Sequence, residues 1–381
     1  MRAMPWPETS VVKQRHEFVL RALEPGANIS DLAREHGISR KTAYKWLERF
    51  RERGVLGLED LSRRPHCSPL RASGEAVLEV LRIRSEHSTW GPKKLHAVLA
   101  RSKKGDELPS VRTIQRILER AGEVTRRRRP APQGRPVTAP ESDVKGPGDL
   151  WTVDFKGWWN ADDGARCEPL TVRDAHSRFV LCAQLVHDTC SEAVKAEFEQ
   201  LFKEHGLPRA IQVDNGPPFA CTRAVCGLTK LSAWWVALGI RVIRGRPAHP
   251  QDNGAHERMH LDMRYEVEDV GADSIAVQQE RLDTWRQEFN HVRPHEALSQ
   301  QTPASVYHVS PRPYKGPRDA CYPPHAIVRV VNSSGRIRYR GHLVRVGTGL
   351  RGYEVGVLEI DDTAVRIQFY ELDLGLFTLA A

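Results

Sequence analysis

The sequence has 381 residues and a mass of 43.1 kDa, more than the ~100–200 residues of a usual domain, which predicts two to four domains. Hydrophobic residues make up 40% of the chain, a globular composition that excludes wholesale disorder. The longest apolar stretch, residues 179–186, is far shorter than the ~20 residues of a membrane-spanning helix, and no charged and then apolar leader opens the sequence. We therefore expect neither a membrane protein nor a secreted one.

The net charge of +9 is unevenly distributed along the chain. Residues 1–140 carry 29 Lys and Arg against 16 Asp and Glu, whereas the remaining residues carry 28 against 32. All of the positive excess thus lies in the first third. A basic surface attracts polyanions, and phosphate neutralisation dominates sequence-independent binding to nucleic acids, so nucleic acid is the expected partner. A solvated basic face without a partner is the alternative.

The seven cysteines include no C-x-x-C pair. The closest two, Cys221 and Cys226, have no second pair with which to build a zinc module. We therefore expect reduced thiols, as in a cytosolic protein, and no zinc site.

The first predicted domain, residues 1–68, is helical. Apolar residues recur at helical spacing over residues 11–23, Ser30 is expected to cap a short second helix, and Gly37 ends that helix. Ser39 caps a third helix with one apolar stripe and an outward polar face. The outward side chains are Arg40, Lys41, Thr42, Tyr44 and Lys45. A helix-turn-helix presents its second helix to the major groove of DNA in this way; an ordinary helical hairpin with a basic face is the alternative.

A second helix-turn-helix-like domain is predicted over residues 69–125. Gly91-Pro92 begins one of its helices, with proline in the first turn, and Ser110 caps the last. This last helix is expected to bury Ile114, Ile117 and Leu118 and to stop at Gly122. Its outward side chains, the predicted second DNA-binding set, are Arg112, Thr113, Gln115 and Arg116.

A basic linker is predicted over residues 126–148. It opens with Arg126, Arg127, Arg128 and Arg129 and continues through a segment rich in proline and glycine, which favours an extended chain. The four arginines are expected to enter a minor groove or follow phosphates. A solvated run of charge is the alternative.

After the linker the pattern changes to strands. Strands are predicted at residues 150–155, 168–172, 178–185, 210–214 and 240–243, with helices at residues 191–205, capped by Ser191, and 231–238. Three early strands followed by alternating helices and strands indicate a mixed sheet flanked by helices over residues 149–310.

The C-terminal residues 311–381 are predicted to form a small β-barrel. Short strands are expected at residues 327–331, 336–339, 342–346, 353–358 and 364–369, separated by turns. Residues 347–352 spell the G-x-G-x-x-G pattern, but no helix follows them, so they predict a hairpin turn and no dinucleotide site. The chain also lacks a Walker A sequence, and we expect no nucleotide cofactor.

Three carboxylates are the candidates for chemistry. Asp154 lies in a predicted strand, Asp214 ends another before an Asn-Gly turn, and Glu257 is placed in the first turns of a helix. Taken singly, each has an ordinary interpretation as a turn, cap or helix-dipole residue. Together they can converge on one sheet edge, where oxygen ligands suit Mg²⁺ and where two ions assist in-line phosphoryl displacement. Mutual repulsion of the carboxylates makes sense only if cations bind.

The residues around these carboxylates resemble a known family. Trp151-Thr152-Val153-Asp154-Phe155, Val213-Asp214-Asn215-Gly216-Pro217 and Pro250-Gln251-Asp252-Asn253-Gly254-Ala255-His256-Glu257-Arg258 resemble the DDE transposases of bacterial insertion sequences. The later segment Asn290-His291-Val292-Arg293-Pro294-His295-Glu296-Ala297-Leu298 is similar to the segment that follows the core in that family. The resemblance covers nearly the whole chain.

The resemblance implies a ribonuclease-H-like core shared with retroviral integrases and a metal-binding triad of Asp154, Asp214 and Glu257. It implies Mg²⁺ or Mn²⁺, two ions, as the cofactor. The implied reaction is 3′-end cleavage at the ends of an element, followed by strand transfer into target DNA. Double-stranded DNA and further copies of the chain, assembled on paired ends, are the implied partners, and the bacterial cytoplasm, at the nucleoid, is the implied location.

The sequence departs from the family pattern in two places. Asp214 and Glu257 are further apart than is usual, and the surplus falls in residues 219–233, which predicts an insertion; Asp252 and Glu266 are alternatives to Glu257. The N-terminal His/Cys zinc module of retroviral integrases is absent. A non-catalytic DNA-binding regulator derived from a transposase, and a nuclease that cannot join strands, remain alternative functions.

Overall fold

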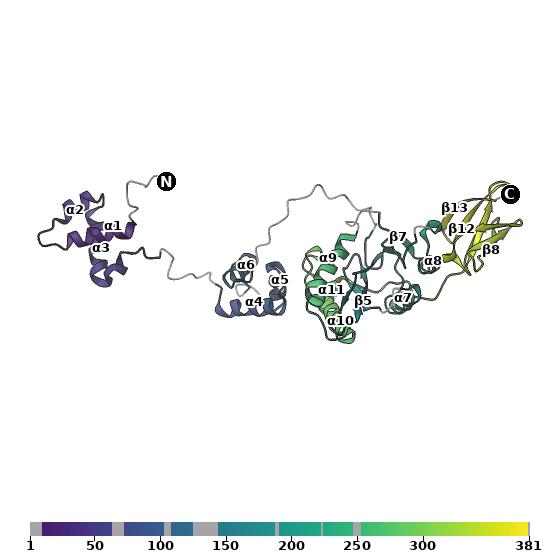
Figure 1. Ribbon diagram of the computed structural model, residues 1–381, viewed down its shortest axis with the longest axis horizontal. Coiled ribbons are helices and arrows are strands. Elements are labelled where there is room, and N and C mark those ends of the chain that lie inside the picture. The colour runs from purple at the N-terminus through teal and green to yellow at the C-terminus, as the bar shows by residue number, and fades with distance from the viewer. Residues whose placement is uncertain are drawn as a thin grey trace. The chain divides into compact units, whose positions relative to one another are not determined.

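The protein is described by a computed structural model (Figure 1). The described residues are 10–62, 72–102, 108–124, 144–186, 190–221, 224–246 and 253–379. The chain divides into two compact units, residues 1–71 and 72–381. No helix in the described ranges is both long and apolar enough to cross a bilayer.

The first unit contains three α-helices and a short 3₁₀ segment. These are α1 (Val11–Ala22), α2 (Ile29–Glu35), α3 (Arg40–Arg53) and η1 (Gly54–Leu58). Ser39 caps α3 as predicted, because its hydroxyl accepts from the Thr42 amide at 3.1 Å. The predicted cap of α2 was wrong: Asn28, two residues earlier than Ser30, accepts from the Ser30 amide. An amide side chain caps as well as a hydroxyl, so the helix begins where the earlier cap allows.

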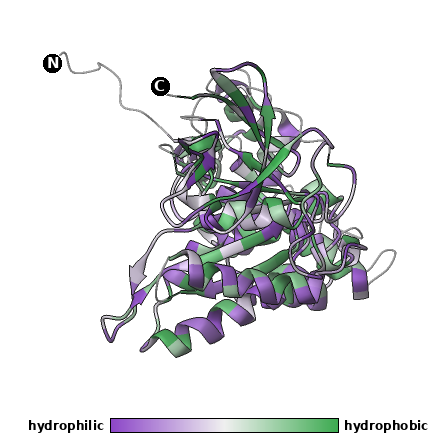
Figure 2. Ribbon diagram, turned by 90° about the vertical axis from the view of Figure 1, so that its right-hand side faces the viewer, coloured by the Kyte–Doolittle hydropathy of each residue, from purple (hydrophilic) through white to green (hydrophobic). Residues whose placement is uncertain are grey.

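Three further helices open the second unit: α4 (Gly74–Glu86), α5 (Pro92–Ser102) and α6 (Val111–Arg120). Proline begins α5, and the Ser110 hydroxyl accepts from the Thr113 amide to cap α6. The predicted inward residues Ile114, Ile117 and Leu118 are all buried. Hydrophobic and hydrophilic residues alternate along the helices, as expected for helices with one buried face (Figure 2).

A five-stranded mixed sheet follows, with strand order β5-β4-β1-β6-β7. Its strands are β1 (Leu150–Phe155), β4 (Pro169–Asp174), β5 (Val180–Leu185), β6 (Ala210–Val213) and β7 (Arg241–Arg244). A short hairpin of β2 (Trp159–Asn160) and β3 (Arg166–Cys167) lies between the first two in sequence. β4 is antiparallel to β1 and β5, whereas β6 is parallel to β1 and β7, which confirms the predicted mixed sheet.

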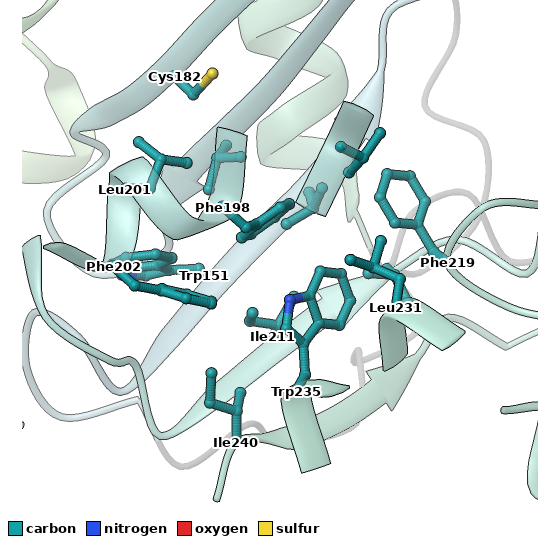
Figure 3. Close-up of a cluster of buried hydrophobic side chains, with 14 of the residues drawn as sticks. Trp151, Cys182, Phe198, Leu201, Phe202, Ile211, Phe219, Leu231, Trp235 and Ile240 are labelled. Carbon is teal, nitrogen blue, oxygen red and sulfur yellow. The ribbon is translucent and has the colours of Figure 1, made fainter. Parts of the chain in front are cut away.

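Helices cover both faces of this sheet. α7 (Ser191–His205) and α8 (Lys230–Ala237) pack on one face, where Trp151 and Val153 of β1 meet Phe198, Phe202 and Trp235 (Figure 3). Cys190 is the N-cap residue of α7 and makes no side-chain capping hydrogen bond, so Ser191 is the first residue of the helix and not its cap. On the other face lie α9 (Gly254–Met263), which continues into a π-helical turn (Arg264–Glu268), α10 (Ile275–His291) and α11 (Pro303–Val306). β1 thus presents an apolar side to α7 and α8 and a polar side, with Thr152 and Asp154, to α9.

The C-terminal strands form two sheets. A four-stranded antiparallel sheet has the order β13-β12-β11-β8, and β9 pairs with β10 alone. Their bounds are β8 (Ile327–Val330), β9 (Arg336–Tyr339), β10 (His342–Arg345), β11 (Glu354–Glu359), β12 (Ala364–Phe369) and β13 (Leu372–Thr378). β13 was not predicted, because Gly375 interrupts its apolar pattern and a β-bulge shifts its register with β12.

The predicted closed barrel is not found, since strand pairing within the described residues leaves the sheets open. Leu228, just before α8, and Ala233 and Val236 of α8 belong to the same buried cluster as the β-strand residues, so a helix that also packs on the five-stranded sheet covers this core. The prediction of a hairpin turn at residues 347–352 was also wrong. This segment contains a 3₁₀ turn (Thr348–Leu350) and joins β10 to β11, two strands that belong to different sheets.

Candidate active site

Asp154 and Asp214 lie on neighbouring parallel strands. The register of β1 and β6 pairs Leu150 with Ala210 and Thr152 with Gln212. Continuing this register by two residues sets Asp154 level with Asp214, which directly follows β6. Paired strands are about 4.8 Å apart, so the backbone alone brings these two carboxylates to one end of the sheet.

Glu257 reaches the same region from α9, and a buried histidine fixes this helix to the sheet. His256 is fully buried, with Nδ1 2.8 Å from the Thr152 hydroxyl and Nε2 2.7 Å from the Thr171 hydroxyl. The next residue, Glu257, is exposed on the helix surface. One turn later, His260 Nδ1 is 3.9 Å from Asp154 Oδ2. The first two turns of α9 therefore lie over the strand that carries Asp154.

The pKa of Asp154 reflects this arrangement. Burial raises it most, and the negative charges of Asp214 and Glu257 raise it further, to about 7, against the opposing effect of the Phe155 amide hydrogen bond. Asp214 and Glu257 are thus each near enough to Asp154 to disfavour its ionised form. A bound cation would reverse this effect and release the proton that Asp154 takes up near pH 7.

The Thr171 hydroxyl is the centre of a buried hydrogen-bond network beneath Asp154. Thr171 lies opposite Asp154 in the antiparallel pair of β1 and β4, and its hydroxyl donates to the Asp154 carbonyl oxygen at 2.9 Å. Its one proton is then used, so the Nε2 atoms of His256 (2.7 Å) and His260 (2.8 Å) must both donate to it. These roles place the ring proton of both histidines on Nε2 and leave a lone pair on each Nδ1 atom.

Both histidines are neutral. Burial lowers the pKa of His256 well below its usual value and that of His260 to about 3, with neighbouring positive charges adding to both effects. Arg173 is one of these charges for each ring. It is itself buried, donates to the Ala255 carbonyl oxygen at 2.6 Å, and burial lowers its pKa to about 9. The histidines therefore act as uncharged hydrogen-bonding groups and place no positive charge beside Asp154.

The donor set suits a hard divalent cation, because Asp154, Asp214 and Glu257 supply only oxygen ligands. Among the described residues, however, no three metal-ligating side chains stand close enough to hold an ion as they are now oriented. Asp214 is exposed, and its Oδ1 accepts from the Asn215 amide at 2.7 Å. Asp154 is the most enclosed of the three, with 27% of its side chain exposed.

The two alternatives to Glu257 have different outcomes. Asp252 lies outside the described residues. Glu266 accepts from Trp285 Nε1 at 2.8 Å and pairs with the fully buried Arg293, which also pairs with Asp262. Glu266 thus belongs to a separate buried ion-pair network, whereas Glu257 is the acid that acts on the pKa of Asp154.

Some of the predicted DNA-binding residues are exposed, and others are hydrogen-bonded within their own helix or to its cap. Six are exposed on α3 and α6: Arg40, Lys41, Tyr44, Lys45, Arg112 and Arg116. Thr42 and Thr113 are each bonded to the capping serine of their helix, and the Gln115 amide donates to Glu119 at 2.9 Å. The arginines at 126–129 lie outside the described residues.

The polar network under Asp154 was not predicted from the sequence. Its members Thr152, Thr171 and Arg173 lie in strands that are otherwise apolar and share one face of the sheet with Asp154. The available signal was their alternation: a polar residue at every second position of β1 and β4 marks a face that packs on polar partners. The spacing of His256 and His260, four residues apart on a helix, gives the matching signal from α9.

Four family models match the chain. Two are described as integrase core domains and match residues 144–250 and 238–303. One described as a helix-turn-helix domain matches residues 14–66, and one described as a homeodomain-like domain matches residues 42–118. The chain therefore carries an integrase core domain behind N-terminal helix-turn-helix domains.

Two curated relatives come from insertion elements. The insertion element IS476 uncharacterized 39.2 kDa protein of Xanthomonas euvesicatoria is 26% identical over 284 residues, 73% of this chain and 78% of that protein. The insertion element IS407 uncharacterized 31.7 kDa protein of Burkholderia multivorans is 26% identical over 227 residues, 59% of this chain and 78% of that protein. With the integrase core, these matches confirm the predicted resemblance to insertion-sequence transposases.

Solved structures with similarity to the chain include two of viral origin. The catalytic core domain of BIV integrase is 24% identical, with 42% of this chain and 93% of that chain covered and a TM-score of 0.33. The simian T-cell lymphotropic virus intasome in complex with PP2A regulatory subunit B56 gamma is 16% identical, with 79% and 99% covered and a TM-score of 0.37.

Proposed function

We propose that this chain, an integrase-core protein with N-terminal helix-turn-helix domains, is a DNA transposase that cleaves the 3′ ends of an insertion element and joins them to target DNA. The observation that carries the proposal is the raised pKa of Asp154, whose causes after burial are Asp214 and Glu257. Asp214, which follows a neighbouring strand, and Glu257, from a helix, thus both act on Asp154 at one sheet end, as a metal-dependent phosphoryl transferase would require.

The helical units would bind the element ends. Exposed basic residues lie at the N-terminal parts of α3 and α6, the helices expected to enter major grooves. Residues 1–140 also hold the whole positive excess of the chain. In the proposed division of labour, residues 1–68 and 69–125 read DNA, residues 126–148 link them to the core at 149–310, and residues 311–381 complete the catalytic half.

Asp154, Asp214 and Glu257 would hold Mg²⁺ or Mn²⁺, two ions in all, and when bound these would activate the attacking oxygen and stabilise the leaving one. Asp154 is held by its strand and by the Thr171 hydrogen bond to its own carbonyl oxygen. His256 keeps α9, and with it Glu257, against β1 and β4. The fixed frame limits the movement needed to assemble the oxygen ligands, which is how positioned groups lower a reaction barrier.

The proposed reaction also sets the partners. Two element ends must be joined to one target, so the active form would be a homo-oligomer on paired double-stranded DNA ends, at the nucleoid in the bacterial cytoplasm. Mass measurement with and without DNA tests this, and a complex with a single copy on each pair of ends would contradict it.

The decisive experiment incubates the purified protein with duplex element ends, target DNA and Mg²⁺. Wild type should yield 3′-nicked and joined products, whereas Asp154→Asn and Glu257→Gln should yield neither while still binding the ends. If wild type binds but gives no cleavage, the chain is a DNA-binding regulator. Cleavage without joined product would identify a nuclease instead.

A further inference from the structure

A cavity of about 540 Å³ lies along β7, the edge strand of the catalytic sheet. Its walls come from three parts of the chain: the segment around Phe219 and Cys226, helix α8, and the C-terminal unit with Arg318, Glu371 and Leu372. The first wall lies within residues 219–233, where the sequence predicts an insertion.

The cavity is lined by both apolar and basic residues. Phe219, Leu228, Val236, Ile240 and Val242 supply the apolar lining, and Arg209, Arg241, Arg244 and Arg318 supply the charge, with Glu371 as the single acid. Apolar walls with a few fixed polar groups are typical of sites for small ligands or single chemical groups.

Two of the four arginines are available to a ligand. Arg318 is paired with Glu371 through both carboxylate oxygens, at 2.9 Å each, and Arg209 lies 3.4 Å from Asp149. Arg241 and Arg244 are exposed and, within the described parts of the chain, make no ion pair with a carboxylate. The cavity therefore has an uncompensated positive charge from β7.

The Arg244 side chain packs directly against Gly227. A Cβ atom at Gly227 would overlap the Arg244 guanidinium, so the glycine leaves the space that this side chain occupies. Gly227 also has a φ of +64°, a conformation that favours glycine. A guanidinium that packs on glycine and lines an apolar cavity can offer a planar pair of donors to phosphate oxygens.

The cavity is next to the proposed catalytic end of the sheet. The register of β6 and β7 pairs Val213 with Arg244, so Arg244 lies one residue before the level of Asp214. The Asn215 side-chain amide also donates to the Gly245 carbonyl oxygen at 2.8 Å, which ties the two strand ends together. Arg244 shares the face of Val213, which α7 and α8 cover, whereas Asp154 lies on the α9 face, so a strand held at the carboxylates would reach the cavity around the ends of β6 and β7.

We propose that this cavity binds an unpaired nucleotide of the DNA strand held at Asp154, Asp214 and Glu257, with the base on the apolar lining and the phosphates on either side of it on Arg241 and Arg244. The inference rests on the proposed function, because that function supplies the DNA. A cavity of about 540 Å³ has the size of a site for one small ligand, which suits one base with its sugar and is too small for a duplex. Stacking of a base on apolar or aromatic groups, with arginine on the phosphate, is the usual chemistry of single-strand binding.

Cys226 gives a local reporter, because its thiol lines the cavity, while Cys321 is exposed elsewhere on the C-terminal unit. The full-length protein is treated with N-ethylmaleimide, with and without a saturating short oligothymidylate, and modification of each cysteine is followed by peptide mass spectrometry. We expect the oligonucleotide to slow modification of Cys226 and to leave Cys321 unchanged. An Arg241→Gln/Arg244→Gln variant should lose this protection, and the oligonucleotide concentration needed for half-protection should rise about tenfold or more.

The matched control is Arg336→Gln/Arg338→Gln, which removes the same charge from exposed positions of β9 outside the cavity and should keep the protection. Thermal melting checks that both double variants fold. Equal modification of Cys226 with and without bound oligonucleotide, or equal loss of protection in both double variants, would overturn the inference. If strand joining by wild type is absent while Cys226 is protected, the proposed function fails and the binding site stands.

Discussion

The two faces of the catalytic sheet are built from the same strands and have opposite character. On one face, Trp151 and Val153 pack with the aromatic side chains of α7 and α8 in a continuous apolar cluster. On the other, Thr152 and Thr171 form hydrogen bonds with His256 and His260 of α9, and Asp154 Oδ2 lies 3.9 Å from His260 Nδ1. Because strand residues alternate between faces, a single strand can serve the core and the site at once.

The difference between the two faces shows how the fold accommodates a buried carboxylate. The apolar face stabilises the fold by burial and tolerates no polar group without a partner. The polar face holds an acid whose pKa is raised by burial and by two neighbouring acids, which costs stability at neutral pH. We expect substitutions on the apolar face to change stability alone, and those on the polar face to separate stability from activity.

Asp154→Asn should have the largest effect and should act on activity. An amide cannot replace the anionic oxygen ligand, so strand joining should fall by about a thousandfold or more. Binding to duplex ends should stay unchanged, since the DNA-binding helices are far from this residue in sequence. Joining assays and gel shifts on the same protein sample measure the two effects, and a parallel loss of binding would contradict the separation.

Phe198→Ala tests the opposite face. Phe198 is fully buried on α7 and its ring lies 4.8 Å from that of Trp235. Its removal should lower the free energy of unfolding by about 3–5 kcal/mol, because a cavity remains in a packed cluster. Denaturant titration measures the loss. Joining activity per folded molecule, at a temperature where the variant is still folded, should remain close to that of wild type.

Thr171→Val removes the centre of the polar network and should have a smaller effect on stability. The substitution leaves two histidine N–H groups and the Asp154 carbonyl oxygen without their partner, which should cost about 1–3 kcal/mol. Joining should also fall, because α9 and Glu257 lose an anchor. Thr284→Val is the control: its exposed hydroxyl bonds only to the Glu280 carbonyl oxygen within α10, so stability and joining should barely change.

Much of this division could be predicted from the sequence. Strand periodicity and turn residues gave β1, β6 and the positions of Asp154 and Asp214, because both signals are local. The contacts of His256 could not be predicted, since Thr152 and His256 are 104 residues apart and meet only when α9 packs on the sheet. The packing of α8 on the C-terminal core was missed for the same reason. The cap of α2 was predicted wrongly for a different reason. Two residues with similar capping ability compete there, and the sequence alone does not distinguish them.

The pH dependence of stability isolates the contribution of one carboxylate on the polar face, Asp154. Asp154 has a pKa of about 7 in the folded protein and about 3.9 when unfolded, so the folded state binds the extra proton between these values. The contribution of Asp154 to the stability of the metal-free protein should therefore be largest at low pH and should fall as the pH rises towards 7. His256 and His260 act in the opposite direction, because their lowered pKa values make folding more favourable as pH rises through the range below 6.5.

Comparison with Asp154→Asn removes the histidine contribution, since both proteins share it. The variant should gain stability relative to wild type as pH rises from 5 to 8, by on the order of 2 kcal/mol, a reduced figure because the carboxyl is partly exposed to solvent. Chemical denaturation in the presence of a chelator, at several pH values, gives the difference curve. Addition of Mg²⁺ should shrink that difference at pH 8, because a cation stabilises only the ionised carboxylate. A flat difference curve would mean that Asp154 does not carry the raised pKa, and would remove the observation on which the metal site rests.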